Sequence, residues 1–324
     1  MHYRYFCSSA LYLYSIASTD SRSRGRMPDR HLRQSDHTEG ARKRKADEAF
    51  RRKENNRRVI ADTLTICENL ETVFRKPRKA HACVLPGCVP RSIMYRENSL
   101  PTRYTCPSVE IYDGDCVCLA REIQKQPGAK VWMLDMASSG KPGGGARSGK
   151  NAQEEHLCRC SNLLPQLEWA ATKHYPLHEQ QPHGMDFKVL VLPEVVFFKD
   201  ASDYSELSPK DWFRIGVIVA AAENISETHY SVGPNATRYI DYLLDVVSMQ
   251  DCSHIILSAW GCGAFKQSAE EVAKIFKQSL TRFDESSFPQ VTFAIIDDHN
   301  SQPPGNLHAF QSVFPNSANY HFRY

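Results

Sequence analysis

The chain has 324 residues, of which 41% are hydrophobic, and this allows one large domain or two modest ones with a real core. No run of eighteen apolar residues occurs, which argues against a membrane-spanning helix. The eleven cysteines lack paired C-x-x-C motifs and regular spacing, so they favour a reducing compartment and argue against a disulfide framework or a structural zinc site.

Positive charge is concentrated near the amino terminus. Residues 22–58 hold fourteen Lys or Arg and six Asp or Glu, which gives a net charge of +8. The whole chain carries +3 and residues 1–21 are neutral, so residues 59–324 carry about −5. The sequence therefore predicts a mildly acidic body preceded by a basic tract.

Residues 1–40 are predicted to be a disordered extension, because polar and charged residues dominate residues 19–40. A short apolar stretch after Arg4 allows two interpretations of the first residues. One is a weak secretory signal. We favour the other, a disordered or mis-annotated extension with Met27 as the true start, because a secreted chain with so many cysteines should show a disulfide framework.

Residues 41–108 are predicted to form a basic helix, from about 41 to 74, and then a proline-rich accessory segment. Apolar residues recur at near-helical spacing only in the second half of this helix, at Ile60, Leu64, Cys67 and Phe74. We therefore expect that half, with the accessory segment, to pack on the body.

The basic tract 42–58 has two interpretations. Its clusters RKRK and RRK fit a nuclear signal or a contact with nucleic acid. The alternative is the solvated face of a long helix. The expected location is accordingly the nucleus, the cytoplasm or both.

Residues 109–324 alternate between predicted strands and predicted helices. The strands are 109–112, 131–136, 189–198, 215–220, 255–258 and 291–296; the helices are 115–124, 152–164, 236–249, 269–282 and 305–314. Interleaved strands and helices predict an α/β fold, a three-layer α/β/α sandwich around a parallel or mixed sheet.

A glycine-rich loop follows the second predicted strand. Gly143, Gly144 and Gly145 let the backbone approach a ligand closely, and two carboxylates, Glu154 and Glu155, begin the next helix. A purely structural interpretation is helix capping, with Asn151 as N-cap and Glu154 three residues later. The alternative is chemistry on a sugar phosphate.

A second loop lies between the predicted strand 255–258 and the predicted helix 269–282. Ser268 and Glu271 fit a capping box at the start of that helix. The backbone N–H groups of the sequence GCGAF, residues 261–265, are suited to cradle a diphosphate.

These loops give the chain its resemblance to the microbial-type poly(ADP-ribose) glycohydrolases. The first motif is LDMASSGKPGGG at 134–145 with QEEHLCR at 153–159, and the second is AWGCGAF at 259–265. Two motifs in this order, more than a hundred residues apart, are more specific than either alone. The resemblance runs from about Thr63 to about Phe314 and implies that residues 109–324 form a macrodomain-like catalytic domain.

The resemblance also implies roles for individual residues. Glu155 is the general acid, while Glu154 and Gln153 belong to the ribose and substrate contacts. The substrate-binding set is completed by Asp135, Gly143, Gly144, Gly145, Gly261, Cys262, Gly263, Ala264 and Phe265. The loop 261–264 would wrap the diphosphate, and loop 143–145 and Phe265 would cover the distal ribose. The alternative for Phe265 is a buried core aromatic.

Cleavage of a ribose–ribose bond requires a proton on the departing oxygen and stabilisation of an oxocarbenium-like transition state. Burial and an acidic neighbour would keep a carboxyl protonated for this purpose, whereas the helix N-terminus favours the ionised form. From the sequence this balance stays open.

The chain departs from the family pattern at Asp135, where the family has Asn. An ionised Asp offers only acceptors and adds a third acid near a polyanionic substrate. Residues 175–186 do not align, so no adenine contact is assigned. Asp297, Asp298 and His299 end the last predicted strand, where they either bind a metal or, as we favour, are solvated.

The resulting expectation is a poly(ADP-ribose) glycohydrolase without metal or organic cofactor, which releases ADP-ribose from the chain end. Its partners would be poly(ADP-ribose) or ADP-ribosylated protein, with a possible nucleic-acid contact, no membrane and a monomeric state. Two alternatives remain: a hydrolase that removes single ADP-ribose units from protein or nucleic acid, and a non-catalytic ADP-ribose-binding macrodomain.

Overall fold

A computed structural model describes residues 30–69, 81–85, 107–182, 184–315 and 318–319 of the chain. Two compact units are distinguished, Met1–Glu48 and Ala49–Tyr324. The first is described only as the beginning of helix α1 (Arg30–Asn69), and the second contains the rest of α1 and the whole α/β body. Among the described helices, none is both long and apolar enough to cross a membrane.

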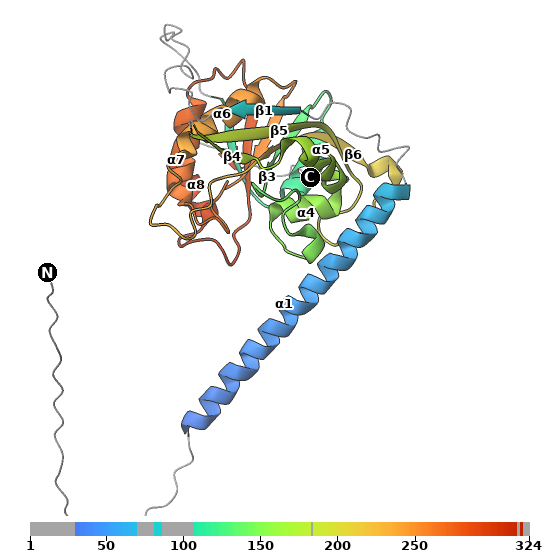
Figure 1. Cartoon of the computed structure of the whole chain (residues 1–324), viewed down its shortest axis with the longest axis vertical. Helices are drawn as coiled ribbons and strands as arrows, with labels where there is room; N and C mark the ends of the chain where they lie inside the picture. Colours follow the sequence, from blue (N-terminus) through green and yellow to red (C-terminus); the bar gives the residue numbers. More distant parts are fainter. Residues whose placement is uncertain (1–29, 70–80, 86–106, 183, 316–317, 320–324) are drawn as a thin grey trace, which may run out of the picture. The chain divides into compact units, whose positions relative to one another are not determined.

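One mixed sheet forms the centre of the body (Figure 1). Its order is β1-β5-β6-β3-β7-β8-β2-β9, with β4 paired to β5. The strands are β1 (His81–Leu85), β2 (Val109–Asp113), β3 (Val131–Met136), β4 (His178–Gln181), β5 (Gly184–Phe197), β6 (Phe213–Ala220), β7 (His254–Leu257), β8 (Gln290–Ile295) and β9 (Ala318–Asn319). Strands β6, β3, β7, β8, β2 and β9 run parallel, whereas β5 is antiparallel to β6, β1 and β4.

Helices cover both faces of the sheet. They are α3 (Cys116–Gln124), α4 (Gln153–Cys160), α5 (Leu163–His174), α6 (Ala236–Ser248), α7 (Ala269–Leu280) and α8 (Asn306–Val313). Successive side chains of a strand point to opposite faces. In β3, Trp132 and Leu134 accordingly pack in one core cluster with α6, α7 and α8, while Val131 and Met133 pack in the other with α3, α4 and α5. The three-layer α/β arrangement predicted from the alternation is confirmed.

The part of α1 in the second unit packs against the body. Ile60 is buried in the same core cluster as α4 and α5. The Thr63 hydroxyl donates to the carbonyl of Arg159 at 2.9 Å, and the Lys199 ammonium pairs with Asp62 at 2.5 Å. The predicted start of this helix, at about residue 41, was wrong, because the helix begins at Arg30, inside the predicted disordered extension. Its expected end at Phe74 lies outside the described residues.

Several other elements differ from the sequence-based expectation. The single helix predicted at 152–164 is two helices, because Ser161 adopts an extended conformation and forms a bridge with Phe197. Strand β1 lies in the stretch predicted as a loop, and β4 and β9 were not predicted. Strands β1 and β9 pair with distant partners, β5 and β2, whereas β4 forms a local hairpin with β5.

Candidate active site

The two glycine-rich loops follow neighbouring strands. Strand β3 ends at Met136, β7 ends at Leu257, and the two strands pair in parallel. Because the carboxyl ends of parallel strands meet at one edge of a sheet, the loops that follow them lie beside each other. The fold thus brings together residues that are more than a hundred positions apart in the sequence.

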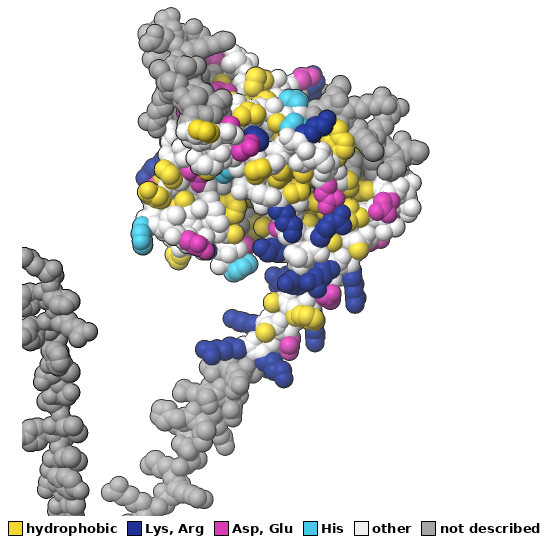
Figure 2. All heavy atoms as spheres, in the orientation of Figure 1, with side chains coloured by type: hydrophobic (Ala, Val, Ile, Leu, Met, Phe, Trp, Pro, Cys, Tyr) yellow, Lys and Arg dark blue, Asp and Glu magenta, His cyan; other side chains and the backbone are white. Residues whose placement is uncertain are grey.

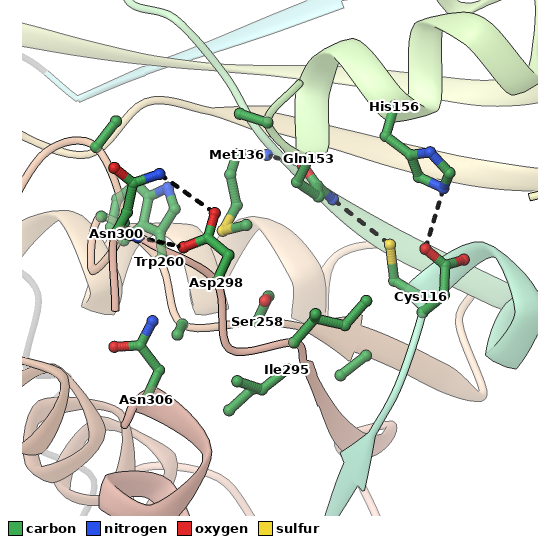
Figure 3. A pocket seen from close by; sticks show the side chains of 18 of the residues that line it. Cys116, Met136, Gln153, His156, Ser258, Trp260, Ile295, Asp298, Asn300 and Asn306 are labelled. Carbon is green, nitrogen blue, oxygen red and sulfur yellow. Dashed lines mark hydrogen bonds and ion pairs between the residues drawn. The ribbon is translucent and has the colours of Figure 1, made fainter. Parts of the chain in front are cut away.

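A cavity of about 370 Å³ lies at this edge (Figure 3). Its walls come from the ends of β2, β3, β7 and β8 and from the first turns of three helices. They include Asp115, Cys116, Met136, Gln153, His156, Trp260, Gly261, Gly263, Ala264, Phe265, Asp298, Asn300 and Asn306. Its size suits a small organic ligand.

The first loop binds the protein's own carboxylates. The Glu155 side chain accepts hydrogen bonds from the amides of Gly145, at 2.8 Å, and Ala152, at 2.7 Å. One oxygen of Glu154 accepts from the amide of Ser138 at 2.8 Å. Both glutamates are nearly buried, with 3% and 5% of Glu154 and Glu155 exposed, and neither lines the cavity.

The capping arrangement predicted for this helix was wrong by one residue. The N-cap position is Ala152, and Glu155 at the third helical position accepts from its amide. Asn151 instead accepts from the Arg159 guanidinium at 2.5 Å. The capping interpretation and the catalytic one therefore concern the same residue, Glu155, because one oxygen caps the helix and the other is held by the loop.

The backbone at Gly144 leaves no space for a side chain. Its φ is +54°, and an added Cβ would lie 2.6 Å from the Glu155 carboxylate and 2.8 Å from that of Glu154. Gly143 has a φ of +69°, and an added Cβ there would lie 2.4 Å from Leu164. The glycines therefore allow the loop to close over the two acids, whereas contact with a substrate ribose remains a prediction.

A third carboxyl, Asp135, completes a buried acidic cluster. It is fully buried, and neither of its oxygens has a hydrogen-bond partner within the described residues. Burial and the neighbouring Glu155 raise the pKa of Asp135 well above its usual range. Burial and Asp135 raise the pKa of Glu154 to about 10. Like Glu154 and Glu155, Asp135 does not line the cavity, and its contact with substrate stays a prediction.

Tyr175 also belongs to this buried cluster, and sequence analysis missed it. Its hydroxyl is buried and has no hydrogen-bond partner in the part of the chain that the structure describes. Its pKa is raised by burial and by Glu154 and Asp135. Because Tyr175 begins the segment that could not be aligned, no motif pointed to it.

Gln153 clamps the end of β3. Its amide nitrogen donates to the carbonyl of Leu134 at 2.7 Å, and its amide oxygen accepts from the amide of Met136 at 2.9 Å. It also lines the cavity beside Cys116, as Figure 3 shows. Since both ends of the side chain are engaged by backbone, its first role is to hold α4 against the sheet.

The second loop leaves its backbone amides free. Gly261, Gly263, Ala264 and Phe265 all line the cavity, and their N–H groups donate to no acceptor within the described chain. Consecutive free amides of this kind form a concave site for anions. Cys262 differs from the expectation, because its side chain is fully buried and its amide donates to the carbonyl of Ala259 at 3.1 Å.

Three further cavity residues had not been assigned a role. Asp115 caps α3 through the amides of Val117 and Cys118 and lies 3.0 Å from the His156 ring. His156 in turn lies 2.9 Å from the Tyr204 hydroxyl. Although burial alone would raise it, the hydrogen bonds from His156 and the two amides lower the pKa of Asp115. The available sequence signal was the capping position of Asp115.

The acids at the end of β8 have structural partners. Asp297 accepts from the amide of Asn306 at 2.7 Å, and Asp298 accepts from the amide of Asn300 at 2.8 Å. Throughout the described ranges no group of three or more His, Cys, Asp and Glu side chains is arranged to hold a metal ion.

The chain is similar to known proteins in sequence and in fold. Residues 46–200 match the family described as "Microbial-type PARG, catalytic domain". A comparison with curated proteins finds no match. Among solved structures, poly(ADP-ribose) glycohydrolase from Thermomonospora curvata bound to the inhibitor ADP-HPD is similar, with 21% identity, a TM-score of 0.63, and coverage of 81% of this chain and 100% of that chain.

The enzyme from Deinococcus radiodurans is also similar. A point mutant in complex with ADP-ribose is 25% identical, with a TM-score of 0.56 and coverage of 75% of this chain and 97% of that chain. Another complex with ADP-ribose is 27% identical, with a TM-score of 0.52 and coverage of 65% of this chain and 86% of that chain. The fold is macrodomain-like, as expected. Through residues 46–200, just under half of its length, the chain is similar to the catalytic domain of the microbial-type poly(ADP-ribose) glycohydrolases.

Proposed function

We propose that this protein is a glycosidase that hydrolyses the ribose–ribose O-glycosidic bond of poly(ADP-ribose) and releases ADP-ribose. The observation that carries the proposal is the pairing of two loops at one sheet edge. One loop fixes Glu155 between the amides of Gly145 and Ala152, and Ala152 lines the cavity. The other loop lines the same cavity with four residues whose amides are free within the described chain. Cleavage of the ribose–ribose bond requires an acid, and binding of the diphosphate requires an anion site.

In the proposed reaction the terminal unit places its diphosphate against the amides of Gly261, Gly263, Ala264 and Phe265. Glu154 has one oxygen with no partner in the described chain, and this oxygen binds the ribose hydroxyls. Glu155 in its protonated form gives its proton to the departing ribose oxygen as the anomeric C–O bond breaks. The resulting carboxylate then takes a proton from the water that forms the new bond to the anomeric carbon. The amides of Gly145 and Ala152 stabilise the carboxylate that remains after the proton has left.

The environment of the buried acidic cluster favours protonated carboxyl groups. Burial raises the pKa of Asp135 well above its usual range and that of Glu154 to about 10, which favours the neutral form of both groups beside Glu155. The chain's Asp in place of the family's Asn therefore adds a protonated neighbour, which can donate a hydrogen bond as Asn does.

The decisive experiment compares the wild type with Glu155→Gln on auto-modified poly(ADP-ribose). We expect at least a roughly thousandfold slower release of ADP-ribose from the variant, because the proton donor is lost. Binding of ADP-ribose should change little. Glu194→Gln, at an exposed position, is the matched control.

The outcomes separate the competing functions. Release from a mono-modified acceptor but not from polymer would indicate the single-unit hydrolase. Tight ADP-ribose binding without release from either substrate would indicate the non-catalytic macrodomain. A Glu155→Gln variant that keeps more than about a tenth of the wild-type rate would contradict the assigned acid.

We further propose a monomer in the nucleus or cytoplasm, with residues 42–45 as a targeting signal. Exposed basic side chains at these positions support the signal. Unchanged localisation after their deletion would refute it, and light scattering tests the monomer. The nucleic-acid contact expected for tract 42–58 rests on positive charge alone, which fits other polyanions equally.

A further inference from the structure

The docked part of α1 adds positive charge beside the first glycine-rich loop. Residues 49–58 carry five exposed Lys or Arg side chains and one Glu. At Gly149 an added Cβ would lie 2.3 Å from the Lys53 carbonyl and 3.1 Å from the Arg57 side chain. Lys53 and Arg57 therefore stand directly against the loop that leads into α4.

Lys150 follows Gly149 directly in this loop. Its aliphatic stem crosses Gly145, where an added Cβ would lie 2.4 Å from the Lys150 side chain, while the residue as a whole is exposed. The amide of the same Gly145 donates to Glu155. We call three of these residues the basic cluster: Lys53, Arg57 and Lys150. The cluster thus adjoins the segment that holds the proposed acid.

The basic cluster is poorly neutralised by the protein. Lys53 and Lys150 form no ion pair within the described residues. In the described part of the chain Arg57 pairs with Glu54 alone, at 3.2 Å, and both side chains are more than 40% exposed, so this pair stabilises little. Lys188 and Lys199, by contrast, each pair with a carboxylate at 2.5 Å.

Figure 2 shows Lys and Arg side chains gathered where α1 joins the body. An unneutralised basic surface on an otherwise acidic body is suited to an anionic partner. The substrate of the proposed function is such an anion, because every unit beyond the terminal one carries a diphosphate. The polymer must continue outward from the bond at Glu155.

We infer that the basic cluster binds the diphosphates of the poly(ADP-ribose) chain beyond its terminal unit. This inference rests on the proposed function. The free amides of loop 261–265 hold the terminal diphosphate, and the cluster holds the next ones. The cluster then acts on affinity for long polymer and leaves affinity for ADP-ribose unchanged.

The test is the triple variant Lys53→Gln/Arg57→Gln/Lys150→Gln, in which glutamine keeps part of each aliphatic stem. The control removes three exposed charges elsewhere: Lys125→Gln/Lys210→Gln/Arg214→Gln. For long polymer in low salt we expect kcat/KM of the cluster variant to fall about tenfold. The slope of log(kcat/KM) against log[salt] should weaken by about two, since each phosphate contact contributes roughly 0.7 on a single strand.

The Kd for ADP-ribose should be the same in wild type, cluster variant and control. Equal kcat/KM and equal salt slopes for cluster variant and control would overturn the inference. So would cluster-dependent binding of a single-stranded oligonucleotide with unchanged polymer kinetics, which would assign the surface to nucleic acid.

If the protein is not a poly(ADP-ribose) glycohydrolase, a binding experiment still tests the role of the basic cluster. If the wild type releases no ADP-ribose, the same triple substitution is compared in equilibrium binding of long polymer at several salt concentrations. Weaker, less salt-dependent binding than in the control would support the polymer surface. Equal binding would overturn it.

Discussion

The two glycine-rich loops of this protein follow neighbouring parallel strands but use their backbones in opposite ways. In the loop after β3, the amides of Ser138, Gly145 and Ala152 donate to Glu154 or Glu155. In the loop after β7, the amides of Gly263 and Ala264 donate to no group within the described chain. The first loop binds the protein's own carboxyl groups, and the second is available for the anion of a ligand.

The helix that follows each loop explains this difference. Helix α4 begins with Gln153, and its glutamates turn back into the loop. Helix α7 is capped by Ser268, whose hydroxyl accepts from the amide of Glu271, while the Glu271 carboxylate accepts from Ser231. Similar sequence signals, glycines before a helix rich in acids, therefore produce a rigid acid in one place and an anion site in the other.

The largest expected effect of altering a loop is at Gly144. Gly144→Ala places a Cβ against both carboxylates at a positive φ, so we expect about 1–3 kcal/mol of destabilisation and a roughly hundredfold slower release of ADP-ribose. Thermal unfolding and kinetics measure the two effects. Gly140→Ala in the same loop meets no atom within 4 Å and should behave as wild type. Equal behaviour of the two variants would show that the loop does not fix Glu155.

The second loop should respond differently. Gly263→Ala also meets no atom within 4 Å, so stability should be unchanged. Because Gly263 lines the cavity, the added methyl group should weaken ADP-ribose binding about tenfold, by roughly 1.4 kcal/mol. Calorimetric titration measures this. Unchanged affinity would place the diphosphate elsewhere.

A smaller effect is expected where α1 supports the first loop. The Asn56 side chain is buried and donates to the carbonyl of Gly149 at 3.2 Å. Asn56→Ala leaves that carbonyl without this donor, so we expect a loss of about 1–2 kcal/mol of stability and a several-fold slower reaction. Asn55→Ala, at the exposed neighbouring position, is the control. Identical rates for the two variants would mean that α1 does not position the loop.

The last test is the pH dependence of stability at Asp135, in which the result is a slope and not a single loss. Its raised pKa means that the folded protein keeps a proton that the unfolded chain releases, so this group's contribution to stability is lost as pH rises. Asp135→Asn removes that loss. The variant should gain stability relative to wild type between pH 5 and pH 8, by at most about 1.4 kcal/mol per pH unit. Denaturant unfolding at several pH values measures this. The exposed Asp113→Asn is the control, and a gain that does not depend on pH would contradict a protonated Asp135.

Sequence periodicity predicted most of the body correctly. Strand β3 was predicted with its observed bounds, and the start of α6 at Ala236 was also correct. Local rules suffice there because alternation with period 2 or 3.6 reflects which side chains face the core. Local rules failed at strand β1 and at the break between helices α4 and α5 after Cys160, since both features depend on pairing with β5.

By itself, the sequence determined the layered α/β architecture and the presence of two glycine-rich loops, because both follow from local pattern and motif. It also determined that an acid pair begins the helix at Gln153. Only the tertiary structure decided that Cys262 faces the core and that Asp135 joins Glu154 in a buried acidic cluster. It also decided that Lys53 stands beside Gly149. The physical reason is that burial, proton affinity and charge pairing depend on neighbours that are distant in the chain and become close only on folding.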